Sequence, residues 1–184
     1  MNKGKLIIIS GPSGVGKSTI RNNIVKERTN YWYSVSMTTR LPRNNEIDGK
    51  DYYFVSKNEF EKNIKNNNFL EYVEVYKDIY YGTPKDKVIN KLNLGYNVIL
   101  EIDVIGGLKV KKIYPDSLLI FIAPPSIKEL EKRLSLRDTD TKESIKERIN
   151  KANYELTYKK YYDYVIINND ILETTNRIID IIEK

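Results

Sequence analysis

Short apolar runs alternate with longer amphipathic segments along most of the chain. Four of these runs have the length of a buried β-strand, and they lie at 6–9, 98–102, 118–122 and 164–167. The segments between them carry the spacing of helices, and strands joined by crossover helices build a mostly parallel sheet. The pattern therefore predicts an α/β fold in three layers around a central sheet.

Polar residues mark where several of the expected helices begin and end. Thr83 stands at an N-cap position, with Pro84 at the first helical position and Gly95 just past the end. Ser126 and Glu129 have the spacing of a capping box, which predicts a second helix start. A last helix is expected over about 171–183.

Two stretches break the alternation. Residues 34–82 are rich in Tyr and Asn, with short alternating segments and one expected helix near 57–65, which indicates a small mixed α/β insert. Residues 125–151 are helical in pattern, strongly charged and without an apolar strand, which is typical of a lid. We expect one domain over 1–184, made of a core (1–33, 83–124 and 152–184), the insert and the lid.

The composition narrows the chemistry. A hydrophobic fraction of 40% and a charged fraction of 30% fit a soluble domain of 184 residues. The chain has no cysteine and no histidine, so disulfides, the usual zinc sites and a histidine base are excluded. Its apolar runs are far shorter than a membrane span, so we expect a cytoplasmic protein with no membrane partner.

The net charge of +6 and the pI near 9.2 favour an anionic partner. The 31 basic residues are spread along the chain, and most lysines alternate with acids on expected helix faces. A nucleic-acid-binding protein usually gathers such residues into one basic patch. We therefore expect nucleotides and not nucleic acid.

A glycine-rich motif directly follows the first expected strand. It has two glycines five positions apart followed by lysine and serine, in the run Gly11, Pro12, Ser13, Gly14, Val15, Gly16, Lys17 and Ser18. Glycines let the backbone curl so that its N–H groups point at phosphate oxygens, lysine adds a mobile positive charge, and serine can ligate Mg²⁺. A helix is expected to follow, so the motif predicts a phosphate loop (P-loop) that binds a nucleoside triphosphate.

Several short segments after the phosphate loop also carry candidate binding residues. The first carries Ser36, Arg40 and Arg43, followed by Glu46 and by Tyr52. Later ones carry Glu71, then Tyr81 and Thr83, then Glu101 and Asp103, then Arg133 and Arg137, and finally Asn168. Through these segments the chain resembles guanylate kinases over nearly its whole length, and this resemblance implies a P-loop NTPase-type fold.

The resemblance assigns roles to the matching positions. It implies ATP binding by residues 11–19, the last being Thr19, with Arg133, Arg137 and Asn168. It implies GMP binding by an arginine and tyrosine phosphate clamp and by groups around the base, namely Arg40, Arg43, Tyr52, Tyr81, Ser36, Glu71, Thr83 and Asp103. Lys17, Arg40, Arg137 and Arg148 are the implied catalytic residues, and Ser18 and, through water, Asp103 are the implied Mg²⁺ ligands.

Elementary chemistry agrees with these roles. Forked guanidinium groups suit a phosphate dianion. A carboxylate at Glu71 can accept the adjacent N1–H and amino protons of guanine, whereas adenine presents an acceptor at N1. The attacking phosphate of GMP is already largely ionised at pH 7, so no protein base is required.

A few positions depart from the family pattern. Ile105 stands where glutamine is common, Asp138 stands where glycine or asparagine is usual, and the connection from Glu71 to Tyr80 is one residue longer. These departures concern the surroundings of Asp103 and the pivot of the lid.

The expected reaction transfers the γ-phosphoryl group of ATP to GMP or dGMP, with Mg²⁺, in a monomer or homodimer. Three alternatives remain at this stage. They are a kinase for another nucleoside monophosphate, a guanylate-kinase-like module that binds phosphorylated partners without catalysis, and a P-loop ATPase or nucleic-acid-handling enzyme.

Overall fold

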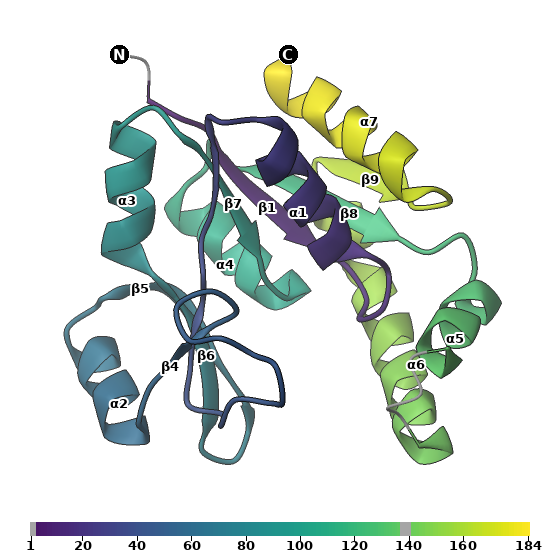
Figure 1. Ribbon diagram of the computed structural model, residues 1–184, viewed down its shortest axis with the longest axis horizontal. Helices are drawn as coiled ribbons and strands as arrows, with labels where there is room; N and C mark the ends of the chain where they lie inside the picture. Colours follow the sequence, from purple (N-terminus) through teal and green to yellow (C-terminus); the bar gives the residue numbers. More distant parts are fainter. Residues whose placement is uncertain (1–2, 137–140) are drawn as a thin grey trace.

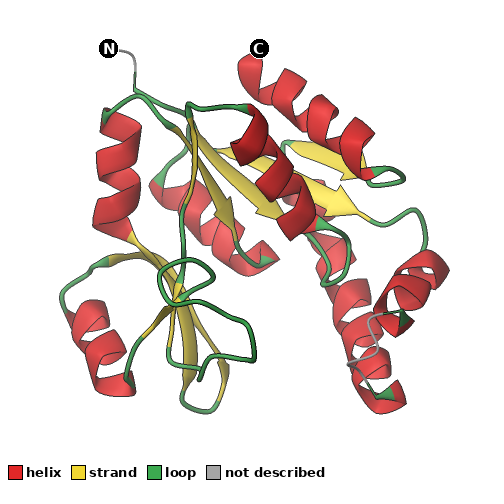
Figure 2. Ribbon diagram, in the orientation of Figure 1, coloured by secondary structure: helices red, strands yellow, loops and turns green. Residues whose placement is uncertain are grey.

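The computed structural model describes residues 3–136 and 141–184. Figure 1 shows a core that carries two appendages on the same side, one built around β5, β6 and α2 and the other from α5 and α6. Figure 2 shows that the core is a layer of strands between helices. Within the described residues, no helix is long and apolar enough to cross a membrane.

The core sheet is entirely parallel and has the order β2-β7-β1-β8-β9. Its strands are β1 (Leu6–Ser10), β2 (Tyr31–Tyr33), β7 (Asn97–Glu101), β8 (Leu118–Ala123) and β9 (Tyr164–Ile167). Four of the five were predicted from their apolar runs. The fifth, β2, was missed because three aromatic residues are too few to show a period, and it forms by pairing with β7 at the sheet edge.

Helices cover both faces of this sheet, which confirms the three-layer prediction. On one face, α1 (Lys17–Glu27) and α7 (Ile171–Glu183) pack on Ile7 and Ile9 of β1. On the other, α3 (Lys85–Asn93) and α4 (Val104–Ile113) pack on Leu6 and Ile8. Because side chains alternate along a strand, β1 belongs to both hydrophobic clusters and is buried throughout.

The insert has its own mixed sheet, in the order β4-β3-β6-β5. Its elements are β3 (Met37–Thr38), β4 (Tyr53–Phe54), α2 (Lys57–Lys65), β5 (Phe69–Tyr76) and β6 (Ile79–Pro84). The α2 bounds agree with the sequence. Phe60 of α2 is fully buried and stacks on Phe69 with ring centroids 4.5 Å apart, so an aromatic cluster holds the helix on the sheet.

The second appendage consists of α5 (Ile127–Ser135) and α6 (Lys142–Leu156). A 3₁₀ turn, η1 (Thr157–Tyr161), joins α6 to β9. Leu130 and Leu134 of α5 and Ala152 of α6 join the α1 and α7 face of the core. Helix α6 is therefore anchored in the core at one end.

One predicted helix start is wrong. Thr83 lies in β6 and Pro84 is the N-cap of α3, with no side-chain cap. Thr83 instead pairs with Glu71 of β5, because tertiary strand pairing outweighs the local signal. The capping box is half formed: Ser126 Oγ accepts from the Glu129 N–H, while the Glu129 carboxylate accepts from Arg133.

Candidate active site

The phosphate loop lies between β1 and α1, at the carboxyl edge of the core sheet. Gly11, Gly14 and Gly16 have positive φ values of 143°, 87° and 102°. A Cβ at Gly11 would lie 2.1 Å from the carbonyl oxygen of Ile122. Only glycine therefore fits at this position, and the loop is built against the neighbouring strand β8.

Two cations converge on this loop. Lys17 Nζ donates to the carbonyl oxygens of Gly11 (2.5 Å) and Pro12 (2.9 Å), so the ammonium group lies over the loop itself. Arg148 of α6 donates from Nη2 to Ser13 Oγ at 2.8 Å. The structure thus brings together Lys17 and Arg148, two of the predicted catalytic residues that are 131 positions apart in sequence.

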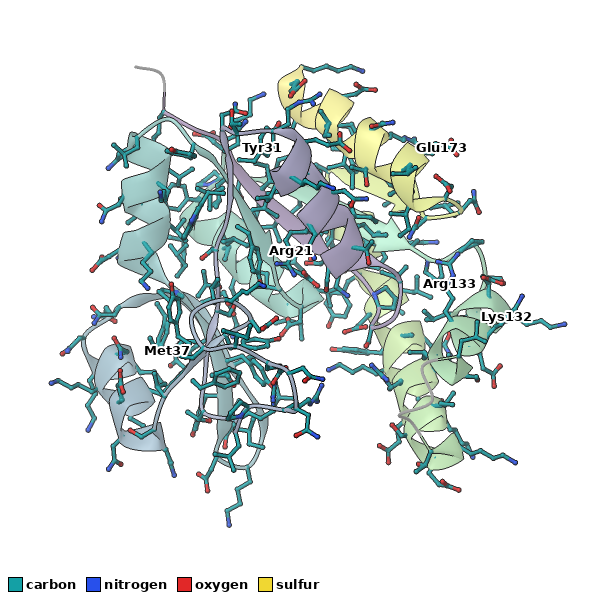
Figure 3. The ribbon with its side chains drawn as sticks, viewed as in Figure 1. Arg21, Tyr31, Met37, Lys132, Arg133 and Glu173 are labelled. Carbon is teal, nitrogen blue, oxygen red and sulfur yellow. The ribbon has the colours of Figure 1, made fainter. Side chains whose placement is uncertain are left out.

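Asn168 ties the end of β9 to the loop. Its side chain is buried, donates from Nδ2 to the Val15 carbonyl oxygen at 2.8 Å and accepts from Thr174 Oγ1 at 3.0 Å. Arg133, labelled in Figure 3, donates to the Asn168 carbonyl oxygen at 3.2 Å. Together they line an open pocket of about 370 Å³ beside the loop, with Gly14, Gly16, Asn169 and Ile171.

A carboxylate to which the sequence analysis gave no role stands next to Ser18. Ser18 Oγ donates to Glu101 Oε1 at 2.8 Å. Glu101 ends β7, which pairs with β1 in a register that sets Ile9 opposite Glu101. The available signal was the position of an acidic residue at the carboxyl end of a strand, because parallel neighbours end at the same edge.

Asp103 has a structural partner of its own. Its Oδ1 accepts the N–H groups of Ile105 (2.9 Å) and Gly106 (2.7 Å), which caps α4. Ile105, which departs from the family pattern, therefore supplies a backbone donor while its side chain is exposed.

The predicted base-reading carboxylate lies where the insert meets α4. Glu71 is only 7% exposed and accepts from Thr83 Oγ1 at 2.7 Å. Burial is the main cause that raises the pKa of Glu71 to about 7, and the charge of Asp103 raises it further. The hydrogen bond from Thr83 and the charge of Lys109 both lower it. Ser36, also predicted here, is buried beside β3 of the same sheet.

The predicted phosphate clamp is partly assembled in the insert. Arg40 donates two hydrogen bonds to Glu46, at 2.9 and 2.8 Å, and a third from Nε to the Tyr81 hydroxyl at 3.0 Å. The Tyr52 ring lies 5.7 Å from that of Tyr81. The hydrogen bond to Glu46 is the main cause that raises the pKa of Arg40, so this guanidinium stays charged. The sequence motif gave Glu46 no role of its own, whereas the structure pairs it with Arg40.

Among the described residues, the side chain of Arg43 forms no hydrogen bond or salt bridge, although its backbone N–H donates to Glu46 at 2.7 Å. Arg137 and Asp138 lie outside the described residues. Thr19, also predicted to bind ATP, lies in the first turn of α1.

Comparison with known proteins identifies the same family. The family model described as guanylate kinase matches residues 3–184. A guanylate kinase from Clostridium tetani is 50% identical over 182 residues, which cover 99% of this chain and 86% of the relative. One from Clostridium acetobutylicum is 49% identical over 180 residues, with 98% and 85% covered.

Solved structures agree in fold. The crystal structure of guanylate kinase from Anaplasma phagocytophilum superposes with a TM-score of 0.82 at 34% identity, covering 99% of this chain and 86% of the other. A shikimate kinase from Bacteroides thetaiotaomicron gives a TM-score of 0.54 at 13% identity, covering 98% and 99%, and shares only the fold. Because the family model matches nearly the full length and these relatives are about 50% identical in sequence, the chain belongs to the guanylate kinase family.

Proposed function

We propose that the chain transfers the γ-phosphoryl group of ATP to GMP or dGMP through the residues assembled at the carboxyl edge of its core sheet. Guanylate kinase activity follows from its membership of the family. The observation that carries the residue-level proposal is the buried pair of Glu71 and Thr83, because a carboxylate next to a hydroxyl in a dry site suits guanine.

The donor half is the phosphate loop and what surrounds it. The loop N–H groups and Lys17 bind the phosphates, with the N-terminus of α1 behind them. Arg133 and Asn168 line the adjacent pocket, where the adenine end of ATP fits. Arg148, already at Ser13, and Arg137 neutralise the charge that develops on the transferred group.

A magnesium ion fits the pair of Ser18 and Glu101. A serine hydroxyl that donates its proton to a carboxylate keeps its lone pairs for a cation. Ser18 would hold the ion together with the ATP phosphates, and Asp103 through water. When bound, Mg²⁺ neutralises charge on the phosphates and orients them for in-line transfer.

The acceptor half is the insert. Arg40 and Arg43 with the hydroxyls of Tyr52 and Tyr81 hold the phosphate of GMP. Glu71, with Ser36, Thr83 and Asp103 near it, accepts from the guanine edge. Glu46 holds the fork of Arg40, so the arginine is oriented before substrate arrives.

Closure of the insert (34–82) and of the lid (125–151) over the core would exclude water and suppress hydrolysis. A monomer or homodimer in the cytoplasm, without nucleic acid or membrane partners, stays a prediction.

A coupled assay of ADP release tests this proposal. Mg-ATP is offered with GMP, dGMP, AMP or dTMP in turn, to the native protein, to Glu71→Gln and to the matched control Glu74→Gln on the same strand. We expect only the guanine nucleotides to drive ADP release, with a loss of at least about tenfold in Glu71→Gln and none in the control. Turnover of AMP or dTMP without GMP would contradict the base assignment.

A binding module without activity is the remaining alternative of a different class. It has no need of a working phosphate loop, and the loop here has its glycine geometry intact. Calorimetry with ATP separates the two, since a pure module would bind none.

A further inference from the structure

Arg21 forms an ion pair that none of the roles above uses. It lies one turn into α1, and its guanidinium carbon is 3.7 Å from the centroid of the Tyr33 ring. Its Nη2 lies 3.3 Å from Glu101 Oε2, and both side chains are only 16% exposed. Figure 3 labels Arg21 beside α1, near the centre of the molecule.

This ion pair is a weak source of stability. Among the described residues, Arg21 Nε and Glu101 Oε2 have no hydrogen-bond partner, so the two charges are removed from water without full compensation. The stack on Tyr33 offsets part of that penalty and fixes the plane of the guanidinium. What the arrangement achieves is a fixed position for the Glu101 carboxylate.

That position matters because of the other carboxylate oxygen. Oε1 of Glu101 accepts from Ser18 Oγ at 2.8 Å, while Oε2 faces Arg21. A serine hydroxyl rotates freely unless an acceptor holds its proton. With the hydroxyl proton of Ser18 directed at Glu101, the lone pairs of Ser18 point away from the carboxylate, as a cation ligand requires.

We propose that Arg21, held by Tyr33, is a positioning residue for the metal ligand Ser18 and acts through Glu101. It touches neither nucleotide nor metal in this role. The inference rests on the proposed function of Ser18 as a Mg²⁺ ligand. It assigns a purpose to a cation on α1 whose charge would otherwise suit direct contact with the substrate phosphates.

Calorimetric titration with ADP, once with Mg²⁺ and once with EDTA, tests the inference. Arg21→Gln is compared with Lys26→Gln, which removes an exposed cation from the last turn of the same helix. We expect Arg21→Gln to weaken ADP binding about tenfold with Mg²⁺, the low end for outer partners of a metal ligand, and to leave it unchanged with EDTA. The control should match the native protein in both.

Three results would overturn it. Equal weakening of ADP binding with and without Mg²⁺ would mean that Arg21 binds the nucleotide directly. Unchanged binding in Arg21→Gln, while the native protein depends on Mg²⁺, would mean that Arg21 positions nothing and would contradict this inference alone. Native binding that does not depend on Mg²⁺ would remove the proposed role of Ser18 as well.

A double-mutant cycle with Glu101→Gln tests the route. If Arg21 acts through Glu101, adding Arg21→Gln to Glu101→Gln should cause no further loss of Mg²⁺-dependent affinity, whereas additive losses would contradict the route.

Because Arg21→Gln leaves the Glu101 carboxylate without its cation and can impair folding, Arg21→Lys serves as a second variant. It keeps the charge but not the planar fork, so its affinity with Mg²⁺ should lie between those of the native protein and Arg21→Gln.

Discussion

At the residue scale, Glu71 combines a charge with a buried position. Its side chain is almost entirely shielded from water, and its one described hydrogen-bond donor is the Thr83 hydroxyl. Burial is the main cause that raises the pKa of Glu71 to about 7, which places its ionisation near neutral pH. The residue proposed to read guanine is therefore also a residue that titrates in the working range.

This pKa predicts that GMP affinity falls on acidification. The guanine edge needs the ionised carboxylate, and at pH 6 only about one tenth of Glu71 would be ionised in the empty site. We expect GMP to bind several-fold more weakly at pH 6 than at pH 8, measured by calorimetry. The phosphate of GMP titrates nearby, so Glu71→Gln provides the baseline: a pH dependence as steep in that variant would contradict the prediction.

The same group should limit the stability of the ligand-free protein. Its folded pKa of about 7 lies above the ordinary 4.5, so the stability it contributes is fully present below 4.5 and is lost as the pH rises to about 7. Glu71→Gln does not titrate and keeps the acceptor for Thr83. At pH 8 it should raise the free energy of unfolding by up to about 3 kcal/mol, with little change at pH 4.

Urea unfolding at the two pH values measures this difference. Glu74→Gln on the same strand is the control, because its carboxylate is exposed and no such gain is expected. Equal pH dependence of unfolding in the native protein and in Glu71→Gln would contradict the assignment of the pKa to this residue.

At the element scale, the contact between α4 and the insert sets the shape of the guanine site. A Cβ at Gly106 of α4 would lie 3.0 Å from Glu71 Oε2, tighter than ordinary contact. The first turn of α4 is also held by the Asp103 cap. The start of this helix therefore positions the carboxylate of Glu71 and leaves no room for a side chain beside it.

Gly106→Ala should separate specificity from stability. Alanine favours the helix by up to about 1 kcal/mol over glycine, which offsets the strain of the displaced Glu71. We expect the KM for GMP to rise at least about fivefold, because the substitution displaces a binding group. The KM for ATP should be unchanged, and the melting temperature should stay near that of the native protein. A matching rise in both KM values, or a collapse in melting temperature, would show that the glycine serves general packing.

At the scale of the whole molecule, the two appendages of Figure 1 are joined to the core by different means. The insert reaches the core through the Glu71 and α4 contact, while α6 reaches the loop through Arg148 and Ser13. Helix α6 runs through η1 into β9, whose end Asn168 binds the loop in turn. This helical arm is thus connected to the donor site at two points, the Arg148 contact and the end of β9.

Removing the arginine of this arm should affect turnover more than binding. Arg148→Gln should lower kcat by about 10²-fold, the usual effect of losing one group that stabilises transition-state charge, with less than about threefold change in the KM for GMP. Steady-state assays with both substrates measure this. Lys146→Gln, an exposed cation on the same helix, should behave as the native protein; a loss there of equal size would indicate general charge attraction instead.

The sequence by itself determined the elements whose signals are local. The apolar runs of the four longer core strands, the glycine pattern of the phosphate loop and the spacing of α2 and α7 were all readable, because burial and turn chemistry act within a few residues. The family motifs likewise pointed to Arg40, Glu71 and Asn168, although their roles in binding stay predictions.

Only the tertiary structure decided which side chains meet. Thr83 lies in a strand, where it pairs with Glu71, and does not cap a helix. The register of β7 on β1 places Glu101 beside Ser18. Arg21 stacks on Tyr33 of β2, a strand too short to be predicted. These contacts join residues far apart in the chain, and their geometry follows from strand pairing and helix packing, which no local pattern of residues contains.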